Sequence, residues 1–112
     1  MMFLLLYRSS PDPSEQPSPA EMQAGYAKWK SWMDKHAKEI LAQPPASSGP
    51  KPGGAAAVCR KGAVTDGPYA EGKEVVGGWS FIQAETLAKA IEIAKEVPMF
   101  GSVEIREITT FG

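Results

Sequence analysis

The sequence predicts a single α+β domain in which two helices cover one face of a four-stranded antiparallel sheet. Apolar runs and helical periodicities alternate along the chain in the order strand, helix, strand, strand, helix, strand. The length of 112 residues suits one domain, residues 1–112, with one modest core. Apolar residues make up 43% of the chain and charged residues 22%, which are ordinary values for a globular protein.

The first predicted element is a strand over residues 2–7, a continuous apolar run that is too short for a helix. Neither of its faces is polar, because the side chains alternate between Met2, Leu4 and Leu6 on one face and Phe3, Leu5 and Tyr7 on the other. Helices can cover only one of these faces. We therefore expect the other face to meet a second subunit.

The second element is a helix that follows a polar, proline-rich surface loop. Ser18, Pro19 and Glu21 predict its start, as a cap, a proline at the first helical position and an acid three residues after the cap. Apolar residues at spacings of three and four predict about six turns. The expected buried stripe is Met22, Tyr26, Trp29, Met33, Ala37 and Ile40, with Trp32 off the stripe as a candidate interface residue.

The segment of residues 43–54 is rich in proline, glycine and serine and predicts a long loop. Residues 55–60 and 63–65 then predict a kinked strand or a short hairpin. A stronger strand follows at residues 75–83, with Trp79 and Phe81 facing one way and Ser80 and Ile82 the other.

The last two elements are a helix over residues 85–97, which Pro98 ends, and a half-exposed strand around residues 103–106. The complete order is that of two split βαβ units, the ferredoxin-like arrangement. Its two helices lie on the same face of the sheet.

Several segments resemble the YCII-related family, specifically its DGPF-domain branch: MFLLLYR, SPAEM at a helix start, VTDGPYAEGKEVVGGW and GSVEIREI. The resemblance spans nearly the whole chain and implies a dimeric α/β barrel, in which two ferredoxin-like subunits face each other through their sheets. Related members resemble lactone-processing or dehalogenating enzymes, and many have a histidine in the first turn of helix one that is thought to act with an aspartate. The matching position here is Glu21, and the only histidine, His36, lies about four turns further along.

The candidate site is the stretch from residue 66 to residue 78, where polar, aromatic and backbone-permissive residues converge. The candidate catalytic residues are Asp66, Tyr69 and Lys73, and the candidate ligand-binding residues are Gly67, Pro68, Glu71, Glu74, Gly77 and Gly78. We expect them to line the mouth of a cleft between the end of helix one and the sheet.

The same residues also have a structural interpretation. Asp66 before Gly67 and Pro68 suits an Asx-type turn, in which the carboxylate accepts backbone N–H groups. Alternating charges over residues 71–74 are typical of a solvated loop. Two adjacent glycines within a strand indicate either a β-bulge or the close approach of a ligand or another backbone.

Charge and cysteine content limit the partners. A net charge of -1 disfavours nucleic acid and membrane surfaces. The single Cys59 cannot form an internal disulfide and is interpreted as a small strand residue, which fits a reducing cytoplasm. His36 has no second metal ligand at helical spacing. We therefore expect no metal and no cofactor.

Two classes of function fit the sequence. The first is a homodimeric small-ligand-binding or regulatory module, which uses a cleft next to the Asp66–Tyr69 loop for a small organic ligand or contacts a regulatory partner protein. The alternative is a small enzyme of the lactone-processing or dehalogenase type, with Asp66 as general base and Tyr69 or Lys73 as acid or oxyanion partner.

Overall fold

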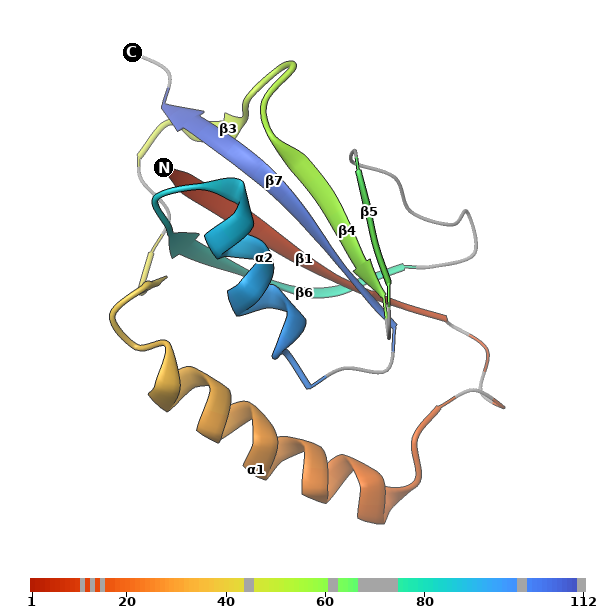
Figure 1. Ribbon diagram of the computed structural model, residues 1–112. Coiled ribbons are helices and arrows are strands. Elements are labelled where there is room, and N and C mark those ends of the chain that lie inside the picture. Colours follow the sequence, from red (N-terminus) through yellow and green to blue (C-terminus); the bar gives the residue numbers. More distant parts are fainter. Residues whose placement is uncertain are drawn as a thin grey trace.

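The computed structural model describes residues 1–10, 12, 14, 16–43, 46–60, 63–66, 75–98 and 101–110. Two helices and one sheet make up these residues (Figure 1). The elements in chain order are β1 (Met2–Ser9), α1 (Pro19–Lys35), β2 (Ile40–Leu41), β3 (Ser48–Pro50), β4 (Ala56–Arg60), β5 (Ala63–Asp66), β6 (Val75–Gln83), α2 (Leu87–Lys95) and β7 (Ser102–Thr110).

The strands form one antiparallel sheet in the order β2-β6-β1-β7-β4-β5, with β3 also paired to β7. β1 and β4 run parallel with β7 between them, and β6 and β7 run parallel with β1 between them. The segments β1-α1-β4 and β6-α2-β7 are therefore two interleaved split βαβ units, as the sequence predicts. β4 and β6 lie on opposite sides of the central β1–β7 pair.

The prediction of four strands was wrong, because the sheet has seven. β2, β3 and β5 are short segments that extend it: β2 pairs with β6, β3 with the end of β7, and β5 with β4 as the second strand of a short hairpin. Runs of two to four residues give almost no periodicity, so pairing to an existing strand determines them rather than their own pattern.

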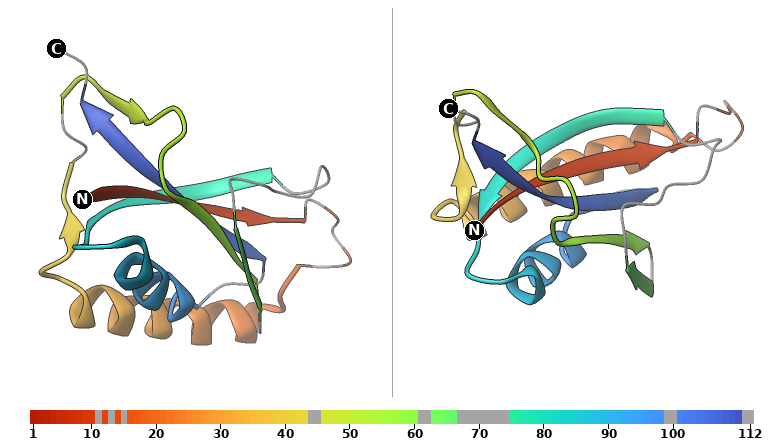
Figure 2. Two further views of the ribbon diagram at one scale, coloured as in Figure 1. Left: turned by 45° about the horizontal axis from the view of Figure 1, so that its top comes forward. Right: turned by 90° about the horizontal axis from the view of Figure 1, so that it is seen from above.

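Both helices lie on the same side of the sheet (Figure 2). The predicted alternation along β1 and β6 is confirmed, since Phe3, Leu5 and Ile82 are fully buried beneath the helices while Trp79 lies on the opposite face and is 65% exposed. The core consists of Phe3, Leu5, Trp32, Ala57, Cys59, Ile82, Ala90, Ile93, Ala94, Val97, Val103 and Ile105. Cys59 is thus a buried core residue of β4, and burial raises the pKa of its thiol.

The predicted start of α1 is confirmed in detail. The Ser18 hydroxyl accepts the Glu21 backbone N–H at 3.2 Å, and the Glu21 carboxylate accepts the Ser18 N–H at 3.1 Å, which forms a capping box. Hydrogen bonding of the Glu21 carboxylate to the Ser18 backbone N–H, and then to the Ser18 side chain, lowers the pKa of Glu21. The helix ends at Lys35 rather than at the predicted Ile40, which belongs to β2.

The predicted buried stripe of helix one is confirmed only at Trp29 and Ile40, which are partly buried against the core, and is wrong at its other four residues, which are exposed. Trp32 is only 4% exposed and His36 only 8%, whereas Tyr26 is 66% exposed and Met22 and Met33 also face solvent. The indole N–H of Trp32 donates to the Ile93 carbonyl at 2.9 Å, near the C-terminal end of α2, where the same carbonyl also accepts the backbone N–H of the C-cap residue Glu96 at 3.3 Å. Burying Trp32 therefore removes a large apolar ring from water while its indole N–H keeps a hydrogen-bond acceptor.

β7 is more buried than the predicted half-exposed strand, because its glutamate is enclosed. The Glu104 side chain is 3% exposed and accepts from Arg8 at 2.9 Å, with the Arg106 Nε 3.4 Å from its other oxygen. Two guanidinium groups thus neutralise a carboxylate on the sheet face opposite the helices. A charge is buried in this way only when it is paired.

Candidate functional site

The structure places part of the predicted site on the sheet. Asp66 is the last residue of β5, where its backbone is opposite Ala57 of β4, and Gly77 and Gly78 lie in β6. The side chain of Asp66 and the residues Gly67, Pro68, Tyr69, Glu71, Lys73 and Glu74 lie outside the described residues. Their roles stay predictions.

The described ends of the predicted site are not adjacent. β5 and β6 are separated by β4, β7 and β1, so four strand spacings lie between Asp66 and Gly78. At the usual spacing of about 4.8 Å, this is about 19 Å along the sheet. A ligand that touches both Asp66 and the two glycines would have to extend across the end of the sheet.

The two glycines form a β-bulge, one of the two alternatives that the sequence left open. In the β1–β6 register Tyr7 is opposite Gly78 and Arg8 is opposite Val76, so Gly77 is the extra residue. A Cβ on Gly77 would meet no atom within 4 Å, and one on Gly78 would lie in ordinary contact, 3.6 Å from the Tyr7 ring. No described backbone approaches closely enough to require glycine at either position.

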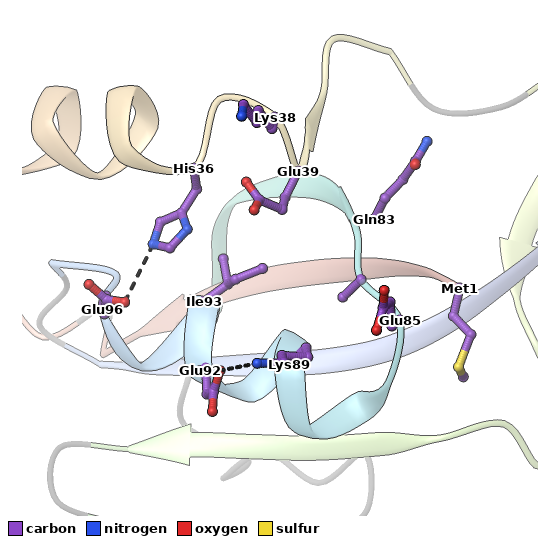
Figure 3. Close-up of a pocket in the computed structure, with 11 residues that line it drawn as sticks. Met1, His36, Lys38, Glu39, Gln83, Glu85, Lys89, Glu92, Ile93 and Glu96 are labelled. Atoms are coloured by element: carbon purple, nitrogen blue, oxygen red, sulfur yellow. Dashed lines mark ion pairs between the residues drawn. The ribbon is translucent and has the colours of Figure 1, made fainter.

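A pocket of about 680 Å³ lies elsewhere, between the C-terminal end of α1, the end of β6 and one side of α2 (Figure 3). Its lining consists of Met1, His36, Lys38, Glu39, Gln83, Ala84, Glu85, Lys89, Glu92, Ile93 and Glu96. β6 begins within the predicted site and ends at the pocket. Gly78, the last residue of the predicted site, and Gln83 of the pocket lining are five residues apart on this strand, about 17 Å at 3.3 Å per residue.

Backbone hydrogen bonds fix the turn that forms one wall of the pocket. The carbonyl of His36, the C-cap of α1, accepts the N–H groups of Glu39 and Ile40, each at 3.0 Å. The carbonyl of Glu39 then accepts the Gln83 N–H at 2.7 Å, and the Ala84 N–H donates to the Met1 carbonyl at 2.9 Å. The wall and the strand end are thus joined through the main chain.

His36 is the most enclosed ionisable residue of this wall. Its ring lies 5.7 Å from that of Trp32, and its Nε2 is 3.5 Å from a Glu96 oxygen, too far for a strong hydrogen bond. The Glu96 carboxylate is hydrogen-bonded instead to the Lys35 ammonium, which lowers the pKa of Glu96. Nε2 of His36 is therefore buried without a hydrogen-bond partner in the described part of the chain.

Glu39 is the second group with unused hydrogen-bonding capacity. Its Oε2 is buried and has no hydrogen-bond partner among the residues that the structure describes. Figure 3 shows its carboxylate directed toward the side of the pocket on which His36 lies, whereas Gln83 extends away. A buried carboxylate oxygen without a partner is costly, so we expect a ligand or an ordered water to hydrogen-bond it.

A row of aromatic rings connects the pocket to the sheet. The rings of Tyr7 and Trp29 meet edge to face at 5.0 Å, and those of Trp29 and Trp32 at 5.6 Å, next to His36. The Tyr7 hydroxyl donates to Ser80 at 2.8 Å, and burial raises the pKa of Tyr7 to about 12. Edge-to-face packing of this kind holds rings in fixed orientations. The row therefore keeps His36 in place.

Fold and pocket together define a small two-layer α+β protein with one ligand-sized pocket described at an end of its sheet. A family model for the YCII-related domain matches residues 1–112, the whole chain, and the protein belongs to the YCII-related family. Comparison with curated proteins gives no match. Glu21 is exposed and engaged in the Ser18 cap.

Sequence reasoning missed His36 and Glu39. The sequence indicated only that His36 has no second metal ligand at helical spacing, and Glu39 lay within the predicted helix. The available signal was the spacing of Trp29, Trp32 and His36, which at three and four residues gives a second helical stripe beside the chosen one. No sequence pattern marks the unpaired oxygen of Glu39, because its burial depends on α2 and β6.

Proposed function

We propose that the protein is a small-molecule-binding module and that the pocket at the end of α1 holds the ligand. One observation carries this proposal: the pocket contains a buried carboxylate oxygen, on Glu39, that has no partner within the described chain. The pocket volume of about 680 Å³ falls within the usual range for small-molecule sites, roughly 300–1,000 Å³. A ligand that hydrogen-bonds Glu39 would offset the cost of burying that oxygen.

The test is a fragment screen by two-dimensional NMR of the ¹⁵N-labelled protein. We expect at least one fragment to cause saturable shifts of backbone amides that surround the pocket, at residues 38–40, 83–85 and 93. Fragments that shift only amides far from these residues, or no amides at all, would contradict the proposal.

We further propose that the protein is a homodimer that pairs through the sheet face opposite the helices. No helix of the described chain covers this face. Trp79 and Leu6 are opposite each other on it, as are Phe81 and Leu4, and Trp79 is largely exposed. A second copy is the partner that would bury the same apolar row on both sides, as two-fold symmetry requires.

Replacing Trp79 with lysine should dissociate this dimer. Because the interface is two-fold symmetric, it contains the substituted residue twice. We therefore expect the dimer dissociation constant to rise by about 100-fold or more. Sedimentation velocity at micromolar concentration measures the change. The control is Tyr26→Lys, an aromatic of nearly equal exposure on α1, which should leave the dimer intact. A wild-type monomer, or a dimer sensitive only to Tyr26→Lys, would contradict the sheet-face pairing.

A second contribution to binding is proposed for Asp66 and the segment 67–74, on the sequence pattern alone. If they form a ligand site, Asp66→Asn should preserve folding but abolish the binding of fragments that shift the amides of residues 75–78. Asp34→Asn, which makes the same charge change on the exposed side of α1, is the control. If Asp66 only closes a turn, Asp66→Asn should instead lower the free energy of unfolding by about 1 kcal/mol and leave binding unchanged.

Within the described residues, neither helix is long and apolar enough to cross a bilayer. The only cysteine, Cys59, is a buried free thiol. We propose the cytoplasm as the compartment, because a reducing environment suits an unpaired cysteine.

A further inference from the structure

We propose that the ligand of this pocket is a small organic cation whose ammonium or guanidinium group is anchored by the Glu39 carboxylate. This inference rests on the proposed binding function and specifies its ligand class. The pocket lining holds four carboxylates against three amino groups, those of two lysines and the amino terminus of Met1. A cation is therefore favoured over an anion at this site.

The four carboxylates are not equally available. Glu92 lies 3.5 Å from the Lys89 ammonium, and Glu96 is hydrogen-bonded to Lys35. Glu39 and Glu85 have no ion-pair partner within the described chain. Of these two, Glu85 is exposed, so only Glu39 combines a free carboxylate with a buried oxygen.

Glu39 is also held in position before any ligand arrives. Its N–H donates to the His36 carbonyl, and its own carbonyl accepts from Gln83 at 2.7 Å, so its backbone is fixed at both groups. A preorganised charged acceptor loses little conformational entropy on binding. Nε2 of His36, in the same wall, offers a second hydrogen-bonding atom to the ligand.

The rest of the lining fits an organic cation rather than a metal ion. The structure places no group of three or more histidine, cysteine, aspartate or glutamate side chains suited to a metal anywhere in the residues that it describes. Ile93, Ala84 and Met1 supply apolar surface to the same pocket. An alkyl chain that carries a charged nitrogen at its end would use both features.

The test is an NMR titration of the ¹⁵N-labelled protein with four matched probes: n-butylammonium, n-butylguanidinium, n-butanol and butyrate. We expect saturable shifts at residues 38–40, 83–85 and 93 with the two cations, and binding of n-butanol and butyrate at least 10-fold weaker. Glu39→Gln keeps the side-chain shape and should weaken cation binding by about 10-fold or more, as for a lost charged hydrogen bond. Asp34→Asn is again the matched control and should bind the cations as the wild type does.

The outcomes separate the ligand class from the pocket. Tighter binding of n-butanol or butyrate at the same amides would overturn the cation while supporting the proposed binding function. Saturation by none of the four probes, together with a fragment screen that yields no shifts there, would overturn both. Unchanged cation binding by Glu39→Gln, with a wild-type amide spectrum away from the pocket, would remove Glu39 as the anchor. If Glu39→Gln does not fold, Glu85→Gln takes its place and should weaken the cations by a smaller factor; no change in that variant would also count against the proposal.

Discussion

Replacing Trp32 with alanine is expected to lower the free energy of unfolding by about 3–5 kcal/mol, the range for removing a buried aromatic ring. Trp32 is almost fully buried, packs against the rings of Trp29 and His36, and donates its indole N–H to the Ile93 carbonyl. Alanine would leave a cavity between α1 and α2 and remove the shorter of the two hydrogen bonds to the Ile93 carbonyl. Urea unfolding followed by circular dichroism measures the loss.

The control for this prediction is Tyr26→Ala, on the exposed side of the same helix, which should change stability by no more than about 0.5 kcal/mol. Trp32→Phe separates the contribution of ring packing from that of the indole hydrogen bond, because it keeps most of the ring and removes the N–H donor. A loss below about 1 kcal/mol for Trp32→Ala would mean that α1 is not anchored by this residue. A larger loss of stability for Tyr26→Ala than for Trp32→Ala would instead favour the buried stripe expected from the sequence.

A second large effect is expected from Gly101→Ala. A Cβ on Gly101 would lie 1.9 Å from the backbone carbonyl oxygen of Arg8, closer than any real Cβ contact. The next residue, Ser102, begins β7 and is opposite Arg8, so neither chain can move without disturbing the central β1–β7 pairing. We expect Gly101→Ala to lower the free energy of unfolding by about 3 kcal/mol, at the upper end of the cost of overpacking.

Gly77→Ala is the matched control, since a Cβ there meets open space. Gly77→Ala should change the free energy of unfolding by no more than about 0.5 kcal/mol. Thermal unfolding of both variants under the same conditions gives the comparison. Equal stability of the two alanine variants would show that Gly101 is not placed against Arg8 as described.

The sequence was sufficient for the long elements because each has a strong pattern of its own. The capping box at Ser18, the alternation along β6 and the apolar run of β1 depend on neighbouring residues alone, and all three are confirmed. The buried face of α1 could not be chosen in the same way. Two stripes overlap on that helix, and the contact that decides between them, Trp32 with Ile93, joins residues 61 positions apart.

The pocket could be predicted from the sequence even less well than the buried face of α1. Glu39 and His36 are unremarkable in sequence, one as an acid near a helix end and the other as a lone histidine next to a lysine. Their environment arises from α2 and the end of β6, which lie more than forty residues further along the chain. Local chemistry drew attention to Asp66–Glu74 instead, because glycine, proline and charge are visible in the sequence while burial is not.

The position of β1 has a consequence for how the protein folds as it is synthesised. Both neighbours of β1 come late: its Tyr7 bonds Ser80, 73 residues away, and its Arg8 bonds Glu104, 96 residues away. At about 5–20 residues per second, the ribosome needs several seconds to supply β6 and β7 after β1 has emerged. During that time the apolar run of residues 2–7 has neither of its strand partners. Folding of this domain is therefore expected to be post-translational, with long-range pairing as the slow step, and the nascent chain is a natural substrate for chaperones that bind short apolar segments.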